Sequence, residues 1–309
     1  MKLNVALPGN HHIPGTPEWS WRLSPADWRR VATTVDQLGY DALSTSEHLA
    51  MPYEEVPRLG PYWLHALSVM AFVAGTTDRV RIDTSVLVLP YHQPLDLAKA
   101  LSTIDVLSAG RLNVSVGVGH AEREFEALGV PFTERGARSD EILAAMKELW
   151  SADEPAFHGR FYDIEGLAFE PKPVQKPRPP IYVGGNSEAA LRRAARHEGW
   201  MCNPSRMAFD DVHPILDYLR GRPELAGKPD FDLFWLPSPD MWEGPAGFGG
   251  ASAAVRDGYR ERLLGWFAEL AGLGMTRNTL PLAPTGTLEE YLDYLHWFDQ
   301  EVAPQMDRS

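Results

Sequence analysis

Glu47 and His48 stand side by side at the end of an apolar run and in front of a loop that contains proline, in the stretch LSTSEHLAMP (43–52). A carboxylate and an imidazole are side chains that enzymes use for general acid–base catalysis near neutral pH. Three interpretations of His48 are open from this pattern alone: a buried core histidine, a metal ligand, or a catalytic acid or base. The choice depends on the elements that position it.

Short β-rich runs alternate with helical patterns along the whole chain. The first helix is the clearest, because Ser24 is a suitable N-cap, Pro25 fills the first helical position, Asp27 completes a capping box and Gly39 ends the helix. The predicted strands are 3–7, 40–46, 79–90, 111–119, 181–185, 200–203, 231–237 and 275–282. The predicted helices lie near 24–39, 62–75, 97–110, 121–128, 134–151, 186–199, 208–220, 252–272 and 287–302.

Eight strand-then-helix units predict an α/β fold with a parallel sheet closed into a (β/α)8 TIM barrel. An open, doubly wound sheet is the alternative. The units fill residues 1–309 as a single domain, and a Pro-rich insertion at 152–180, between strands four and five, is expected to form a small hairpin and an extended segment. A Gly-rich stretch at 243–250 is expected to be a mobile loop.

In a (β/α)8 barrel the active site lies at the C-terminal ends of the strands. Half of the ten histidines follow predicted strands directly, and this concentration favours a site at that rim. The polar residues and glycines at the predicted strand ends are Asn10, His11, His12, Glu47, His48, His92, Gly117, Gly119, His120, Gly184, Gly185, Asn186 and Asn203.

Composition excludes some classes of partner and indicates a compartment. The net charge of −13 and the pI near 5.2 argue against nucleic acid and anionic membranes, because both bind basic surfaces. Cys202 is the only cysteine, so no intrachain disulfide can form and a reducing cytoplasm is expected. We find no signal-peptide pattern and no run long enough to span a membrane.

The histidines do not have the spacing of a metal site. Metallohydrolase barrels usually carry two histidines one residue apart, so that both rings point inward from one strand. His11 and His12 are adjacent instead, and no His-Glu-x-x-His motif occurs. We therefore expect no metal. A nucleophilic mechanism is also not indicated, since the chain has no Gly-x-Ser-x-Gly motif.

Two glycine-containing stretches follow predicted strands. GVGHAE (117–122) is not a dinucleotide fingerprint, because Glu122 stands in place of the third glycine and the stretch follows the fourth strand instead of the first. Its glycines are explained by a tight turn or by the close approach of a flat ligand. VGGNSE (183–188) opens a helix whose free N–H groups form a generic phosphate site. Its simpler interpretation is a strand-to-helix turn with Ser187 as N-cap.

These residues resemble the bacterial luciferase-like superfamily of flavin- or deazaflavin-dependent oxidoreductases. The most specific stretch is TTDRVRIDTSVLVLPYHQPLDLAKALSTIDVLSAGRLNVSVGVG (76–119), and DQLGYDALSTSEHL (36–49) is similar to the family's second strand with its acidic-His end. The resemblance covers most of the chain but is weak over 205–275. It implies a (β/α)8 barrel, often dimeric, that binds FMN or coenzyme F420 at the strand C-termini.

Carried over residue by residue, the resemblance places Glu47 and His48 beside the cofactor ring. The cofactor-binding positions that it implies are the bulge Ser85, Val86 and Leu87, where the family often has a non-prolyl cis peptide, the strand-four edge Val118, Gly119 and His120, and the phosphate-binding Gly184 and Gly185 with Asn186.

Two departures from the family pattern bear on the cofactor. Residue 120 is His, where deazaflavin members commonly carry Glu, Thr or Trp. Leu49 follows His48, whereas luciferase-type flavin members often read Glu-His-His. The second departure favours F420 over FMN.

The resulting hypothesis is hydride transfer between F420 and a small, partly apolar substrate, with His48 as acid or base and Glu47 orienting it, in a homodimer. Strict strand alternation points the Glu47 and His48 side chains apart, so their pairing needs a bent strand end. An FMN-dependent monooxygenase that uses O2 and a non-catalytic flavin-binding protein are the alternatives. Aromatic loop residues, which equally often only pack loops, are expected to contact substrate: His12, Trp21, Tyr53 and Trp63.

Overall fold

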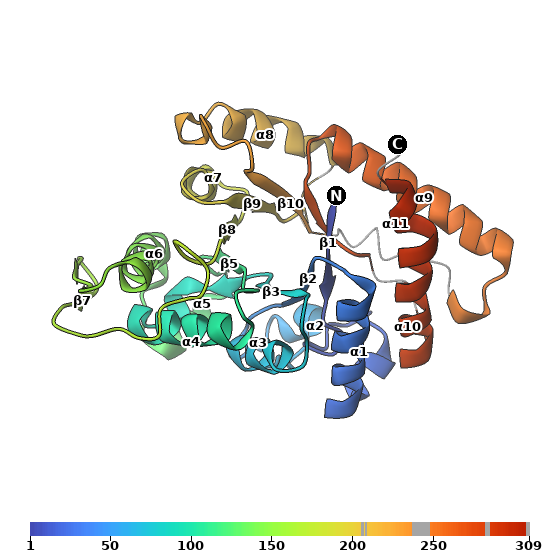
Figure 1. Cartoon of the computed structure of the whole chain (residues 1–309), viewed down its shortest axis with the longest axis horizontal. Helices are drawn as coiled ribbons and strands as arrows, with labels where there is room; N and C mark the ends of the chain where they lie inside the picture. The colour runs from blue at the N-terminus through green and yellow to red at the C-terminus, as the bar shows by residue number, and fades with distance from the viewer. Residues whose placement is uncertain (205–206, 208, 237–247, 282–284, 307–309) are drawn as a thin grey trace.

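Parallel strands form one sheet at the centre of the molecule, and helices surround it (Figure 1). The computed structural model describes residues 1–204, 207, 209–236, 248–281 and 285–306. Over these residues the sheet order is β3-β2-β1-β11-β10-β9-β8-β5-β4, and neighbouring strands pair in parallel. The strands are β1 Lys2–Ala6, β2 Ala42–Thr45, β3 Arg81–Thr84, β4 Leu87–Val88, β5 Val114–Gly117, β8 Ile181–Gly184, β9 Gly199–Cys202, β10 Asp232–Trp235 and β11 Arg277–Thr279.

The two edge strands of this order, β3 and β4, are halves of the predicted third strand. β3 pairs with β2 and β4 pairs with β5, while a bridge between Ile82 and Leu112 joins β3 to the chain just before β5. The sheet therefore closes into the predicted (β/α)8 barrel, and the open-sheet alternative is wrong. The single strand predicted at 79–90 is also wrong, because the chain leaves the ladder at Ser85–Val86, whose peptide bond is cis, as the family resemblance implied.

Helices cover the outside of the barrel, and their ends follow the capping signals. The α1 capping box between Ser24 and Asp27 is present, and Gly39 ends that helix at a φ of 79°. Among the described residues no helix is both long and apolar enough to cross a membrane. The helices are α1 Pro25–Leu38, α2 Val56–Leu59, α3 Ala66–Ala74, α4 Pro94–Leu107, α5 Glu122–Leu128, α6 Arg135–Ser151, α7 Glu188–Ala194, α8 Val212–Arg220, α9 Ala253–Gly272, α10 Leu288–Trp297 and α11 Ala303–Met306.

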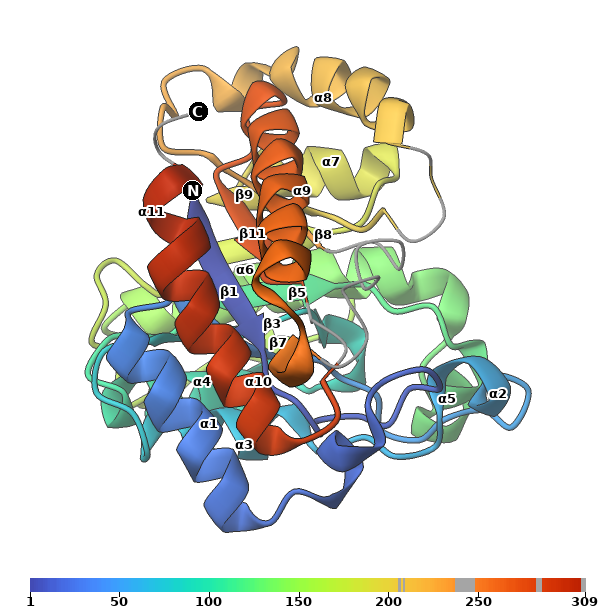
Figure 2. The same cartoon turned by 90° about the vertical axis from the view of Figure 1, so that its right-hand side faces the viewer.

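The last helices return to the first, so that the two ends of the barrel sequence meet. Figure 2 shows α10 lying along α1, with Tyr40 donating a hydrogen bond to the main-chain oxygen of Leu295 (2.9 Å). The segment 152–180 contains the expected hairpin, in which β6 (Phe157–His158) pairs antiparallel with β7 (Asp163–Ile164). Most of the predicted mobile loop at 243–250 lies outside the described residues.

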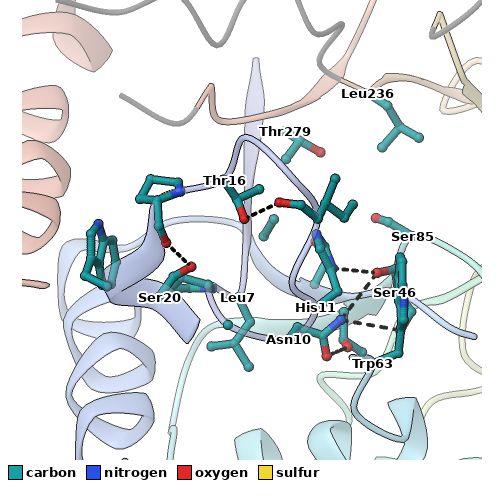
Figure 3. A pocket seen from close by; sticks show the side chains of 18 of the residues that line it. Leu7, Asn10, His11, Thr16, Ser20, Ser46, Trp63, Ser85, Leu236 and Thr279 are labelled. Carbon is teal, nitrogen blue, oxygen red and sulfur yellow. Dashed lines mark hydrogen bonds between the residues drawn. The ribbon is translucent and has the colours of Figure 1, made fainter. Parts of the chain in front are cut away.

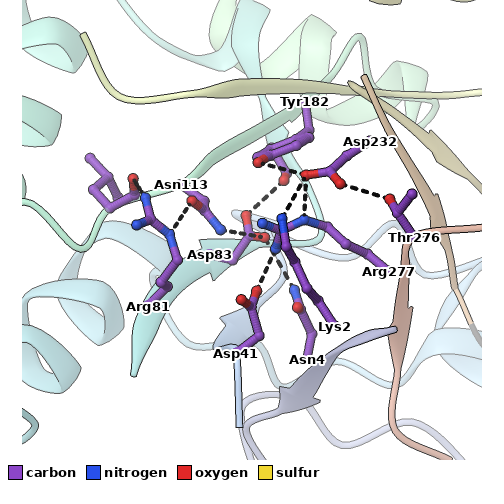
Figure 4. Close-up of polar contacts among 12 residues, drawn as sticks. Lys2, Asn4, Asp41, Arg81, Asp83, Asn113, Tyr182, Asp232, Thr276 and Arg277 are labelled. Atoms are coloured by element: carbon purple, nitrogen blue, oxygen red, sulfur yellow. Dashed lines mark hydrogen bonds and ion pairs between the residues drawn. The ribbon is translucent and has the colours of Figure 1, made fainter. Parts of the chain in front are cut away.

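A buried polar network fills the N-terminal end of the barrel (Figure 4). Arg277 pairs with Asp232 (2.7 Å) and Asp41 (2.5 Å), and Asp83 accepts hydrogen bonds from Ser115 and Asn4. Because these groups bind one another, they close this end of the barrel. A hollow of about 340 Å³ lies outside this network, beside Lys2 and Asp41, and two further cavities lie at the C-terminal end of the strands.

Candidate active site

Two adjacent cavities open at the C-terminal ends of the strands, where the sequence predicted a site. The first has a volume of about 300 Å³ and is walled by the backbone of 117–119 and 184–185; we call it the glycine-walled cavity. The second, of about 290 Å³, includes Thr279 and Thr285 and is called the hydroxyl-lined cavity (Figure 3). The two adjoin, because both are lined by Ser46, Trp63, Ser85, Asn203 and Leu236.

His48 lines the glycine-walled cavity and is held there by a carboxylate that the sequence did not indicate. Its Nδ1 lies 2.6 Å from Oε2 of Glu124, which is 4% exposed. The imidazole ring also meets the edge of Trp63, with ring centres 4.6 Å apart. With Nδ1 engaged, Nε2 is the nitrogen of His48 that can exchange a proton at the cavity.

Glu124 is built to remain a carboxylate. Burial alone would raise its pKa, but hydrogen bonds from His48 and from the N–H groups of Ala50 and Leu49 lower the pKa below its ordinary value. The Tyr91 hydroxyl donates a further bond to Oε2 (2.9 Å). An ionised Glu124 accepts a hydrogen bond from the Nδ1–H group of His48. This bond fixes the tautomer and the orientation of the ring.

Glu47 is turned away from His48, as strand alternation implied. Its Oε2 accepts a hydrogen bond from the N–H of Val88 (2.6 Å), and its Oε1 lies 3.0 Å from Nε2 of His92. The residue is buried and fastens the segment after the bulge to the end of β2. The hypothesis that Glu47 orients His48 is therefore wrong, since Glu124 makes that contact.

Of the remaining rim histidines, His120 lines the glycine-walled cavity, His11 lines the hydroxyl-lined cavity and His12 lines neither. The His120 ring meets His48 edge-on, with ring centres 5.4 Å apart, and burial together with the nearby His48 lowers its pKa. His11 stacks on Trp63 and lines the hydroxyl-lined cavity. His12 lines neither cavity, because it is stacked between Tyr62 (ring centres 3.8 Å apart) and Trp21 (5.2 Å).

The bulge after β3 brings two of its three predicted residues to the cavity. Ser85 and Val86 line the glycine-walled cavity, and the Ser85 hydroxyl is buried without a hydrogen-bond partner among the described residues. Leu87 lines neither cavity and packs fully buried in the core, so its side chain does not reach the predicted cofactor position.

Glycine is required opposite the bulge because Val86 occupies the space of a side chain. A Cβ on Gly117 would lie 2.7 Å from Cγ2 of Val86, and one on Gly184 would lie 3.1 Å from its Cγ1. Gly119 adopts a φ of 77°, which favours glycine. The result is a wall of bare backbone, in which Val118 also takes part, that a flat ring can approach.

Asn186 follows the glycine wall, but its side chain is engaged elsewhere. The amide nitrogen donates to the main-chain oxygen of Asn203 (2.7 Å) and contacts the sulfur of Met207 (3.1 Å). The amide oxygen accepts from the N–H of Asn203 (3.2 Å). Asn186 therefore ties the loop after β9 to the start of α7, and Gly185 alone continues the cavity wall.

The predicted aromatic contacts are only partly at the cavities. Trp63 lines both of them. Trp21 stacks on His12, and its Nε1 donates to Thr16 (2.8 Å). Tyr53 is 94% exposed and lines neither cavity, so the structure does not bring it to the site.

Sequence reasoning missed Glu124, Thr279 and Thr285 as members of the site, and it gave no role to Tyr91, which stands at the predicted end of strand three. Glu124 lies among charged residues at the start of a short helix, where acids normally face solvent. Helical spacing gave no signal for it, because the rim residue His120 lies before α5, which begins at Glu122. Thr279 and Thr285 had no comparable signal.

The barrel places a cavity beside His48, and comparison with known proteins identifies the family. The model of the luciferase-like monooxygenase family matches residues 1–240. The chain therefore belongs to the luciferase-like monooxygenase family, an enzyme family, as the sequence predicted.

Its relatives use both kinds of cofactor. An F420-dependent glucose-6-phosphate dehydrogenase of Amycolatopsis mediterranei is 30% identical over 190 residues, which are 60% of this chain and 55% of the relative. An FMNH2-dependent dimethylsulfone monooxygenase of Pseudomonas putida is 36% identical over 138 residues, 44% of this chain and 38% of the relative. The crystal structure of monooxygenase RslO1 from Streptomyces bottropensis matches 99% of both chains with a TM-score of 0.79 and 24% identity, and shares the fold.

Proposed function

We propose that the protein is an F420-dependent oxidoreductase that transfers hydride to or from a small, partly apolar organic substrate, with His48 as the acid or base. The observation that carries this proposal is the His48–Glu124 pair at the edge of the glycine-walled cavity. A flat cofactor in that cavity and a substrate in the adjoining hydroxyl-lined cavity share Trp63 and Ser85 as neighbours.

His48 supplies the proton chemistry that accompanies hydride transfer. Its Nδ1 proton is held by Glu124, so Nε2 accepts the proton of a substrate hydroxyl during oxidation or returns it during reduction. Positioned acid–base groups of this kind typically contribute about 10²–10⁴-fold to a rate. Glu47 contributes by fixing the backbone of Val88 beside the cavity.

The residues of the glycine-walled cavity fit a flat ring. Gly117, Gly119 and Gly184 line this cavity without side chains of their own, and the buried Ser85 hydroxyl has no hydrogen-bond partner among the described residues, so a ring heteroatom can supply one. His120 flanks the same space, and Gly184 with Gly185 would hold the phosphate end. When bound there, a deazaflavin supplies the hydride chemistry that the side chains of this chain lack.

The second candidate is an FMN-dependent monooxygenase that uses O2. The similarity to the dimethylsulfone monooxygenase favours it, because 36% identity is higher than that of the F420-dependent relative. Both candidates use the same cavity for the cofactor. In the F420-dependent oxidoreductase the electrons move between cofactor and substrate, whereas in the FMN-dependent monooxygenase they pass to O2.

Titration of the apoprotein with F420 and with FMN separates the candidates. We expect F420 to bind more tightly, with substrate-dependent change in its absorbance and no O2 uptake. Tighter binding of FMN with substrate-dependent O2 uptake would establish the monooxygenase. Cofactor binding without turnover of any substrate would indicate a flavin-binding protein that is not an enzyme.

Replacement of His48 tests its role. His48→Gln is expected to lower kcat by about 10²-fold or more while the cofactor Kd stays within a few fold, because the proton carrier is lost and the glycine wall is intact. His213→Gln, at an exposed site on α8, is the matched control and should leave both constants unchanged. Unchanged turnover in His48→Gln contradicts the assignment.

The quaternary structure proposed with this function is a homodimer, following the family resemblance. Size-exclusion chromatography with light scattering measures it directly. A mass near twice the 34.5 kDa of the chain supports the dimer, and a mass of one chain rejects it.

A further inference from the structure

The hydroxyl-lined cavity carries no formal charge on its described walls. None of the described residues that line it is Asp, Glu, Lys or Arg. Its titratable member is His11, and burial together with His12 and His48 lowers the pKa of that imidazole to about 4. The described walls are thus neutral at physiological pH. A charged ligand would have to give up its hydration without gaining an opposite charge from them.

Three hydroxyl groups in this cavity have no hydrogen-bond partner in the part of the chain that the structure describes. Thr279 Oγ1, Thr285 Oγ1 and Ser85 Oγ are buried and unpartnered among the described residues, and Thr279 and Thr285 are each only 4% exposed. They come from the end of β11, the following loop and the bulge after β3, and Figure 3 shows the Thr279 and Ser85 hydroxyls near Leu236. Buried polar groups are nearly always satisfied, so these three indicate a missing partner.

Other hydroxyls of the same cavity are already committed. Thr16 Oγ1 donates to the main-chain oxygen of Ile13 (2.7 Å) and accepts from Trp21 Nε1, and Thr45 donates to Asn10. The unpartnered groups are therefore a distinct subset and not a general property of the rim. Apolar side chains complete the walls, among them Leu7, Ile13, Trp19 and Leu236.

We propose that the hydroxyl-lined cavity is the substrate site and takes a small uncharged alcohol, or the ketone or aldehyde formed from it, whose oxygen binds Thr279 and Thr285. A threonine hydroxyl both donates and accepts, so the same pair serves the alcohol and the carbonyl compound. The site rejects phosphorylated and carboxylated compounds of the same size. This assignment rests on the proposed function and deepens it by naming the substrate class.

The chemistry balances for this pair of compounds. Oxidation removes a hydride, with two electrons, from the carbon and a proton from the hydroxyl oxygen, and a C=O double bond replaces the C–H and O–H bonds. A deazaflavin held in the glycine-walled cavity would accept the hydride, and His48, which lines that adjoining cavity and not the hydroxyl-lined one, would accept the proton. Reduction runs the same steps backwards.

Ligand binding to the apoprotein tests the substrate class without any cofactor. The probes are cyclohexanol, cyclohexanone, cyclohexanecarboxylate and cyclohexyl phosphate, and tryptophan fluorescence reports binding because Trp19 and Trp63 line the cavity. We expect the two neutral probes to bind at least 10-fold more tightly than the two anions. Equal binding of the anions, or no binding of the neutral probes, overturns the proposal.

Two isosteric variants test the threonines. Thr279→Val and Thr285→Val should each weaken cyclohexanone binding several-fold, yet leave the melting temperature of the apoprotein unchanged or higher, because each removes a buried hydroxyl that has no partner. Thr103→Val is the matched control, because this threonine is exposed on α4 and lines neither cavity, and the affinity of the variant for cyclohexanone should not change. Unchanged affinity in both test variants overturns the assignment.

The substrate class and the proposed function can be rejected independently of each other. If neither F420 nor FMN binds, the proposed function is wrong, and the preference for neutral probes is still measured. If F420 binds and His48→Gln abolishes turnover but the anions bind best, the proposed function stands and the substrate class is wrong.

Discussion

The two ends of the barrel are both polar, but they differ in how their polar groups are satisfied. At the N-terminal end, Arg277 lies between Asp232 and Asp41, and Asp83 accepts hydrogen bonds from several strands (Figure 4). At the C-terminal end, the hydroxyls of Thr279 and Ser85 have no hydrogen-bond partner among the described residues and lie beside open cavities. The first arrangement closes the barrel, and the second leaves binding capacity for a ligand.

The same strands serve both ends, so the difference arises from position along each strand. Arg277 begins β11 and Thr279 ends it, and both face the inside of the barrel because they are two residues apart. At the N-terminal end the side chains contact one another, and at the C-terminal end they line a cavity. In β11, the first residue therefore contributes to stability and the last residue lines a binding cavity.

The largest expected effect comes from breaking the network at the N-terminal end. Arg277→Met removes the buried cation beside Asp232 and Asp83, leaves Asp232 with the longer contact to Lys2 (3.6 Å), and is expected to lower the free energy of unfolding by about 3–5 kcal/mol. Urea denaturation followed by circular dichroism measures this. The exposed pair of Arg30 and Glu289 provides the control, and Arg30→Met should change stability little. Similar losses in the two variants would refute the distinction.

An intermediate effect is expected at the C-terminal end, on turnover instead of stability. Glu124→Gln keeps the size of the side chain but removes the charge that holds Nδ1 of His48, so kcat should fall about 10-fold or more with the cofactor Kd little changed. Tyr91→Phe removes one donor to the same carboxylate and should cost less. Steady-state kinetics and cofactor titration measure both variants. Full activity in Glu124→Gln would show that His48 needs no carboxylate partner.

The most gradual expected effect, spread over a range of pH, is a difference in acid sensitivity between the two ends. Because the pKa of His11 is lowered to about 4, the unfolded chain binds a proton below pH 6.5 that the folded chain does not, and stability falls between pH 6.5 and 4. The pKa of Asp232 is lowered from 3.8: burial opposes this shift, but Arg277 outweighs it, so stability from that carboxylate is lost only below about pH 3.8.

His11→Gln isolates the contribution of the C-terminal end. The slope of unfolding free energy against pH between 6.5 and 4 should decrease by at most about 1.4 kcal/mol per pH unit, with no change in slope below pH 3.8. His213→Gln, at an exposed position, is the control for a histidine in ordinary solvent. An identical pH dependence in the wild type and His11→Gln would contradict the prediction.

Much of the fold and part of the site could be predicted because their signals are local. The Ser24 cap and the Gly39 stop are written within one helix, and both are present. The bulge at Ser85–Val86 came from the family resemblance and not from the β-branched run itself, which predicted an unbroken strand. Tyr53 was misplaced because an aromatic loop residue gives no signal of whether it faces a cavity or solvent.

The sequence by itself determined that eight strand-and-helix units follow one another and that His48 stands at the end of the second strand. These are properties of neighbouring residues, which periodicity and capping chemistry report. Only the tertiary structure decided that His48 is paired with Glu124, 76 positions away, and that Thr279 and Ser85 share a cavity. Such contacts depend on closure of the barrel and on strand register, and these arise when the whole sheet forms.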